Sequence, residues 1–156
     1  MSDKISIGRI AKIHPKLRTD CSDVLIEIQK RGIDIRITQG LRTIAEQDAL
    51  YAQGRTTPGK KVTNAKGGSS MHNYGCAVDF CLLHKDGTIS WSMTEDIDKD
   101  GKKDWMEVVE VFKAHGWTWG GDFKSILDTP HFEKGFGYTL EQIKQLKKDA
   151  EGYPII

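Results

Sequence analysis

Two short segments of this chain carry side chains that could bind a metal ion and activate water. His72 and Asp79 lie in the first segment, and Asp128 and His131 lie in the second. Two imidazoles and one carboxylate around an open fourth position are the donors of a catalytic zinc site, whereas structural zinc sites close all four positions with protein ligands. We therefore expect His72, Asp79 and His131 to bind zinc. Asp128 is then available as the base for the attacking water.

The spacing of these residues alone leaves a plainer interpretation open. Single histidines are more often surface or core residues than ligands, and residues 128–130 also form an ordinary turn opener. Pro130 fixes the backbone before His131, and Gly75 and Ala77 would let the backbone pass close to the metal, which favours a ligand set. Manganese or cobalt would suit the same donors. Cys81 could add a thiolate, although a free cysteine is more often a small buried hydrophobic residue.

A second group of residues matches the template of a calcium-binding loop. Carboxylates stand at its ligand positions, and a glycine stands at its sharp turn. These residues are Asp96, Asp98, Asp100, Gly101, Asp104 and Glu107. Lys103 occupies a position that is usually apolar, and there is no paired second loop. An acidic loop that only caps the following helix is the alternative; we favour calcium, because these carboxylates repel one another without a cation.

Size and composition indicate one globular domain. The chain has 156 residues, of which 38% are apolar and 29% charged, which is ordinary for a soluble protein. Its net charge of +1 gives no field that favours nucleic acid or an anionic membrane. Three cysteines, an odd number, suit a reducing compartment. We expect a single catalytic domain over residues 1–156 with a calcium-loop-like insertion at 95–107, in a monomer without a nucleic-acid or membrane partner.

Hydrophobic periodicity predicts the elements that position the candidate site. Helices are expected over residues 15–31, 43–54 and 105–116 and from Thr139 onward, and capping boxes begin the second and the last. Strands are expected over 33–38, 75–83, 88–91, 117–121 and 129–133. Helices intermixed with short antiparallel strands indicate an α+β fold. Arg42 then lies at a strand-to-helix corner, from which its side chain can reach a site.

The segment 54–69 is expected to be a basic loop. It carries Arg55, Lys60, Lys61 and Lys66 and no acidic residue. A solvated loop is the plainer interpretation, and the alternative is a rim that contacts a carboxylate-bearing substrate. Under the second interpretation Arg55 is a candidate substrate-binding residue.

Several motifs, in this order along the chain, resemble those of the zinc L-alanyl-D-glutamate endopeptidases of the D-alanyl-D-alanine carboxypeptidase-like peptidase family, which includes bacteriophage endolysins. The matching residues are Gly40, Leu41, Arg42, Thr43, Glu46 and Gln47; Tyr51, Gly54, Arg55, Thr56, Pro58 and Gly59; Ser70, His72, Asn73, Tyr74, Gly75, Ala77, Val78, Asp79 and Phe80; Trp119, Gly120, Gly121 and Asp122; and Asp128, Pro130, His131, Phe132 and Glu133. The resemblance implies a small antiparallel sheet flanked by helices, as in Hedgehog domains and D,D-peptidases. Phe123 departs from the pattern, because many relatives have Trp there.

The resemblance also implies roles for individual residues. It implies zinc on His72, Asp79 and His131, with Asp128 as the catalytic base. Arg42 would face the substrate, and Ser70 would lie at the edge of the site. The acidic loop likewise resembles that of relatives that bind calcium.

The activity implied is cleavage of bacterial peptidoglycan between L-alanine and D-glutamate of the stem peptide, by a cell-wall lytic enzyme. Two alternatives are a D,D-carboxypeptidase or dipeptidase that releases terminal D-alanine, and a non-catalytic zinc-stabilised binding module, which would not need Asp128. The first residues lack the apolar segment and cleavage site of a signal peptide. We therefore expect synthesis in the cytoplasm of the producing cell and action on the wall after the membrane is breached, as for a phage or prophage enzyme.

Overall fold

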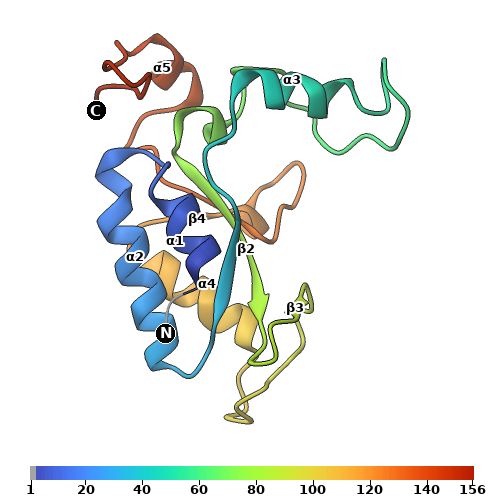
Figure 1. Ribbon diagram of the computed structural model, residues 1–156, viewed down its shortest axis with the longest axis vertical. Coiled ribbons are helices and arrows are strands. Elements are labelled where there is room, and N and C mark those ends of the chain that lie inside the picture. The colour runs from blue at the N-terminus through green and yellow to red at the C-terminus, as the bar shows by residue number, and fades with distance from the viewer. Residues whose placement is uncertain (1–2) are drawn as a thin grey trace.

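The computed structural model describes residues 3–156. Met1 and Ser2 lie outside the described residues, although they belong to the expected domain and to the N-terminal segment that lacks signal-peptide features. An antiparallel sheet runs through the molecule in the strand order β1-β2-β5-β4, and β3 pairs with β2 (Figure 1). The strands are β1 (Ile35–Gln39), β2 (Ala77–Leu83), β3 (Ile89–Ser90), β4 (Thr118–Trp119) and β5 (His131–Glu133).

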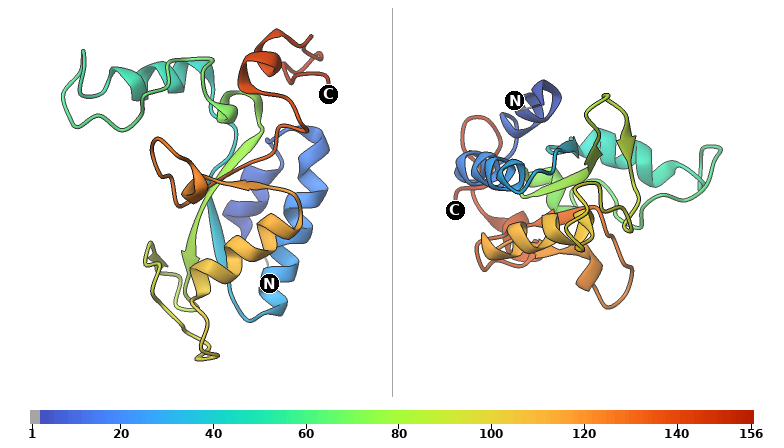
Figure 2. Two further views of the ribbon diagram at one scale, coloured as in Figure 1. Left: turned by 180° about the vertical axis from the view of Figure 1, so that it is seen from behind. Right: turned by 90° about the horizontal axis from the view of Figure 1, so that it is seen from below.

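Helices flank this sheet. They are α1 (Lys4–Ile10), α2 (Pro15–Lys30), α3 (Ile44–Ala52), α4 (Asp104–Ala114) and α5 (Leu140–Gln145), with short 3-10 helices η1 (Met71–Tyr74) and η2 (Gly120–Asp122). Helix α1 contacts β1 and α2, and α2 contacts α4, so these helices gather beside the sheet (Figure 2). Helices α3 and α5 lie toward one end of the molecule, and the acidic segment before α4 lies at the other (Figure 1). The expected α+β class is confirmed.

An aromatic cluster between the sheet and α4 forms the centre of the core. Phe132 of β5 stacks on Phe112 of α4 with ring centroids 4.0 Å apart, and Phe80 of β2 lies 4.3 Å from Trp105. Successive side chains of a strand point to opposite faces of the sheet. Because Phe80 and Phe132 face the helices, their neighbours Asp79 and His131 point to the other face.

Most predicted elements are present, and two helices differ from the expectation. Capping boxes begin α3 at Thr43 and α5 at Thr139 as predicted. The sequence did not predict α1, because Ile5 and Ile7 are exposed while Ser6 is buried and its hydroxyl accepts a hydrogen bond from the Ile37 amide. Helix η1 was also missed and replaces the loop expected around His72.

His115 joins the end of α4 to α2. Its Nδ1 lies 2.8 Å from Asp20 Oδ1, and its Nε2 lies 2.7 Å from Glu27 Oε2. The hydrogen bonds to Glu27 and Asp20 raise the pKa of His115 above its ordinary value of 6.5. The nearby Lys134 ammonium pairs with the same Asp20 carboxylate and donates to the His115 carbonyl.

We predict that His115 stabilises the fold most strongly at mildly acidic pH. A raised pKa in the folded state means that the stabilisation is fully present below pH 6.5 and is lost as the pH rises through the folded-state pKa. A cation at a helix C-terminus stabilises the folded state by about 1 kcal/mol. His115→Gln should therefore lower the unfolding midpoint Tm by about 2–4 °C at pH 5.5. The difference from the wild type should shrink at pH 9.

Thermal unfolding at both pH values measures this effect. Glu110→Gln is the control, since it removes one charge of an exposed ion pair, with Arg31, on α4, the helix that His115 follows. An equal loss for His115→Gln at both pH values would show that the charge of His115 does not contribute.

Candidate active site

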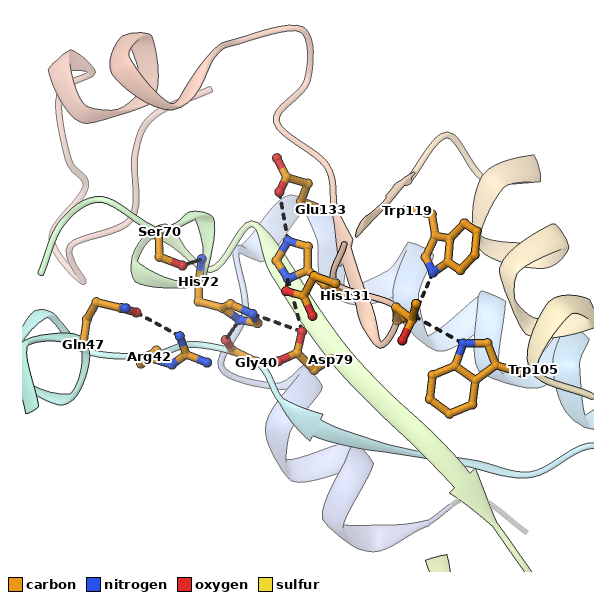
Figure 3. Close-up of polar contacts among 12 residues, drawn as sticks. Gly40, Arg42, Gln47, Ser70, His72, Asp79, Trp105, Trp119, His131 and Glu133 are labelled. Atoms are coloured by element: carbon orange, nitrogen blue, oxygen red, sulfur yellow. Dashed lines mark hydrogen bonds and ion pairs between the residues drawn. The ribbon is translucent and has the colours of Figure 1, made fainter. Parts of the chain in front are cut away.

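The pairing of β2 with β5 brings the first two candidate ligands together. Asp79 and His131 are register partners, and Asp79 Oδ1 lies 3.1 Å from His131 Nδ1. His72 comes from η1, and its Nε2 lies 3.3 Å from the same carboxylate oxygen (Figure 3). One possible ligand atom from each residue lies within 4.8 Å of the others. The structure thus brings together the three residues that the sequence predicted as zinc ligands.

The second nitrogen of each imidazole has an acceptor that orients the ring. His72 Nδ1 lies 2.8 Å from the Gly40 carbonyl oxygen, and His131 Nε2 lies 2.8 Å from Glu133 Oε1. A carbonyl or a carboxylate only accepts, so these nitrogens carry hydrogen, and His72 Nε2 and His131 Nδ1 face Asp79. This arrangement is typical of metal-bound histidines. Glu133 was not predicted as a site residue, although its position two residues after His131 on a strand places both on one face.

The charges of the cluster favour a bound cation. Burial opposes ionisation of Asp79, but hydrogen bonds from His131 and His72 outweigh it and lower the pKa of Asp79. Burial also opposes a charge on His131, but Asp79 and Glu133 raise its pKa to about 9. The negative field that holds a proton on His131 would also attract a divalent metal ion. The donor set and its partners therefore fit zinc.

Helix η1 presents His72 through local hydrogen bonds. Ser70 and Asn73 form a capping box at its start, and the Ser70 hydroxyl accepts from the His72 amide. Gly75 ends the helix with φ at 71°, and a Cβ there would lie 2.5 Å from the His14 backbone nitrogen. We expected Gly75 to make room for the metal; its close approach is instead to the backbone at His14.

Asp128 lies beside the ligands but outside their hydrogen-bonded group. Its Oδ2 is 3.7 Å from His131 Nδ1, and 49% of its side chain is exposed. Partial burial raises the pKa of Asp128. A carboxylate that faces both the ligands and solvent can accept a proton from water in the pocket, as predicted for the base.

Arg42 forms the opposite side of the pocket. Its backbone amide donates to the His72 carbonyl, and its Nη1 lies 2.9 Å from Gln47 Oε1. Its buried Nε has no hydrogen-bond partner in the described part of the chain. Gln47 is fully buried, and its Nε2 donates to the Ala65 carbonyl at 2.8 Å. Gln47 therefore connects Arg42 to the basic loop, a role that was not evident from the sequence.

The pocket has a volume of about 460 Å³. Its lining includes Arg42, Val62, Thr63, Ser70, His72, Asp79, Phe123, Asp128, His131 and Glu133. Ser70 thus lies at the site, as the resemblance implied.

The structure places two other candidates differently. Arg55 does not line the pocket, because its guanidinium stacks 3.9 Å from the ring centroid of Tyr51 and donates to the Tyr51 and Thr63 carbonyls. These contacts hold the basic loop, and a contact with substrate stays a prediction. Cys81 is fully buried and does not belong to the metal-ligand group. It fills the role of a small hydrophobic residue.

The acidic segment forms a separate cluster at the far end of the molecule. Asp96, Asp98 and Asp104 form one possible metal-binding group, and Asp98, Asp100 and Glu107 form another that shares a residue with it. Asp104 Oδ1 and Glu107 Oε2 are buried and have no hydrogen-bond partner within residues 3–156. Burial, together with the charges of the neighbouring aspartates, raises the pKa of Glu107 to about 7.

Comparison with known proteins identifies the relatives of this chain. Residues 63–134 match the model of a family described as D-alanyl-D-alanine carboxypeptidase. The chain is 49% identical over 121 residues to the peptidoglycan L-alanyl-D-glutamate endopeptidase CwlK of Bacillus subtilis, covering 78% of this chain and 72% of the relative. It is 28% identical over 135 residues to the L-alanyl-D-glutamate peptidase of Listeria phage A118, covering 85% of this chain and 42% of that protein.

A solved structure supports the fold. The L-Ala D-Glu endopeptidase ChiX of Serratia marcescens aligns with a TM-score of 0.53 and 24% sequence identity, covering 85% of this chain and 88% of the other. At this identity the likeness shows a common fold.

We predict that Gln47 holds the basic loop against the site. Gln47→Met keeps the length of the side chain but leaves the Arg42 and Ala65 partners unpaired, which costs about 1–3 kcal/mol. The Tm should fall by about 3–10 °C. Trypsin should cleave after Lys60 or Lys61 faster than in the wild type.

The control is Gln145→Met, because Gln145 is exposed on α5. Calorimetry and timed proteolysis below Tm measure the two effects. A Gln47→Met variant with wild-type Tm and cleavage rate would show that this buried amide does not hold the loop.

Proposed function

The chain belongs to the D-alanyl-D-alanine carboxypeptidase family of peptidases, and from this premise we propose that it is a zinc-dependent endopeptidase of bacterial peptidoglycan. The bond that it hydrolyses joins L-alanine to D-glutamate in the stem peptide. The observation that carries the proposal is the His72–Asp79–His131 group with the carboxylate of Asp128 beside it. The choice of bond is supported by the relatives from Bacillus subtilis and Listeria phage A118, which are both named for it.

His72, Asp79 and His131 would hold the zinc ion. Zinc in such a site acts as a Lewis acid and lowers the pKa of bound water toward neutrality. Gly40 and Glu133 keep both imidazoles in the orientation and tautomer that a metal requires.

Asp128 and Arg42 carry out the remaining chemistry. Asp128 takes a proton from the attacking water and later delivers it to the amine of the leaving group. Its raised pKa brings it closer to the range in which a carboxylate can both accept and return a proton. Among residues 3–156 the Arg42 Nε has no hydrogen-bond partner, and the Arg42 guanidinium donates to the oxyanion that forms at the scissile carbonyl.

The biological role that follows is lysis of the cell wall. Hydrolysis of stem peptides disconnects glycan strands, and one curated relative is a phage peptidase. Among the described helices, none is long and apolar enough to cross a membrane.

We predict that Asp128→Asn retains zinc and lowers kcat by about 10²–10⁴-fold, because the amide cannot accept the proton. His131→Ala should lose zinc as well as activity. Elemental analysis measures the metal, and turnover is measured on purified peptidoglycan. Mass spectrometry of the products should find new L-alanine carboxyl ends and D-glutamate amino ends.

Two variants outside the pocket are matched controls. Asp23→Asn removes an exposed carboxylate of α2, and His84→Ala removes a histidine outside the pocket. Wild-type turnover by Asp128→Asn would overturn the role of Asp128. Release of free D-alanine would instead identify a D,D-carboxypeptidase, and binding without turnover would identify a binding module.

We also propose that the acidic segment 95–107 binds calcium. The buried oxygens of Asp104 and Glu107 support this proposal, because a buried carboxylate oxygen without a partner is costly and a cation would satisfy it. Gly101 has a φ of 87°, as the sharp turn of such a loop needs, and α4 begins at Asp104.

Calcium added to protein that retains zinc should raise the Tm by about 5–10 °C at saturation, from the free energy of binding to the folded state. Glu107→Gln should abolish most of this increase. Glu110→Gln, an exposed change on the same helix, should respond like the wild type. If the Tm of the wild type does not change when calcium is added, the segment does not bind calcium and only caps α4.

A further inference from the structure

Two indole groups donate to one backbone carbonyl beside Asp128. Trp119 Nε1 lies 2.7 Å from the Thr129 oxygen, and Trp105 Nε1 lies 3.3 Å from the same atom. The two side chains come from β4 and α4 and point at this carbonyl from different directions (Figure 3). A carbonyl oxygen has two lone pairs and can accept both hydrogen bonds. Thr129 is the residue that directly follows Asp128.

The backbone on the other side of Asp128 is also fixed from this region. The Asp128 amide donates to the Gly120 carbonyl at 3.0 Å. A Cβ at Gly120 would lie 2.2 Å from the backbone carbonyl oxygen of Asp128, so only glycine permits this close approach of the two backbones. Gly120 therefore holds the peptide group that precedes Asp128, and Trp119 holds the peptide group between Thr129 and Pro130, one residue beyond it.

The Asp128 carboxylate has little else to orient it. Nearly half of its side chain is exposed, and its only close polar neighbour in the described structure is His131 Nδ1, at 3.7 Å. Its position relative to the metal ligands must come from the main chain. Trp117 shows that a buried indole does not need this particular acceptor, because its Nε1 donates to Asp20 instead.

We propose that Trp119 and Trp105 are positioning residues for the proton-transfer carboxylate. By holding the Thr129 carbonyl from two sides, they keep Asp128 at a fixed place and angle beside the metal ligands. The inference rests on the function proposed for Asp128. Displacement of a catalytic group by about 1 Å can cost ~10²-fold in rate, so the loss of an indole N–H should appear in kcat.

The test uses Trp119→Phe, Trp105→Phe and the double variant, which retain an aromatic ring and lose the N–H. We expect kcat on peptidoglycan fragments to fall by about 3–30-fold for Trp119→Phe, less for Trp105→Phe with its longer bond, and by ~10²-fold for the double variant. KM and zinc content should stay within about twofold of the wild type, since no residue that binds the metal or lines the pocket is changed.

Trp117→Phe is the matched control, because it removes an equally buried indole N–H that serves Asp20. All assays are run well below the lowest Tm. Replacement of Trp119 by 3-benzothienylalanine, which keeps the shape of the indole and lacks only the N–H, separates the hydrogen bond from packing. It should reproduce the kcat loss of Trp119→Phe.

Equal kcat losses in the Trp117, Trp105 and Trp119 variants would overturn the proposal in favour of general destabilisation. Wild-type kcat in the benzothienylalanine variant would overturn it in favour of ring packing. A failure of the proposed function is distinguishable, since Asp128→Asn itself would then retain wild-type turnover.

Discussion

The site depends on the register between β2 and β5. This register places Asp79 opposite His131 on one face of the sheet, while Phe80 and Phe132 are buried on the other. A shift of one residue would turn the ligands toward α4 and the phenylalanines toward the pocket. Burial of the aromatic side chains disfavours that exchange strongly. The hydrophobic core thus fixes the geometry of two charged ligands that would otherwise gain little from being close together.

Main-chain groups complete the site around this pair. The Gly40 carbonyl orients His72, the His72 carbonyl accepts from the Arg42 amide, and the Thr129 carbonyl accepts from two indoles. Each of these contacts joins segments that are distant in the sequence. Trp105 also lies between Asp104 and Glu107 on the first turn of α4, so a cation held by the acidic segment would act on the residue that contacts Thr129. The first turn of α4 therefore connects the acidic segment to the backbone that follows Asp128.

The sequence predicted the ligands better than it predicted what supports them. His72, Asp79, His131 and Asp128 could be proposed because residue type and order along the chain limit the possible chemistry. Gln47 could not, since its role depends on which groups tertiary folding brings next to it. Glu133 was missed although it lies two residues after His131 on one strand, where alternation places both side chains on one face. The same limit explains α1, where burial of Ser6 against β1 overrides an apolar pattern that does not fit a helix. Arg55 was a candidate for substrate contact because it lies in a basic loop; its guanidinium contacts the Tyr51 ring, and a contact with substrate stays a prediction.

The two carboxylates of the site differ in function because their surroundings differ. Asp79 is flanked by two imidazoles that hold it ionised and lower its pKa, as a ligand requires. Asp128 has no hydrogen bond of this kind within residues 3–156, and partial burial raises its pKa. When the surroundings of two neighbouring acids separate their pKa values, one acid stays ionised and the other can carry a proton. One site thus obtains both functions from two residues of the same type. Burial raises the pKa of Asp128 although the nearby His131 lowers it, and the two side chains are not hydrogen-bonded at 3.7 Å. The position of Asp128 must therefore be set from outside the ligand group. The carbonyl held by Trp119 and Trp105 provides such a support.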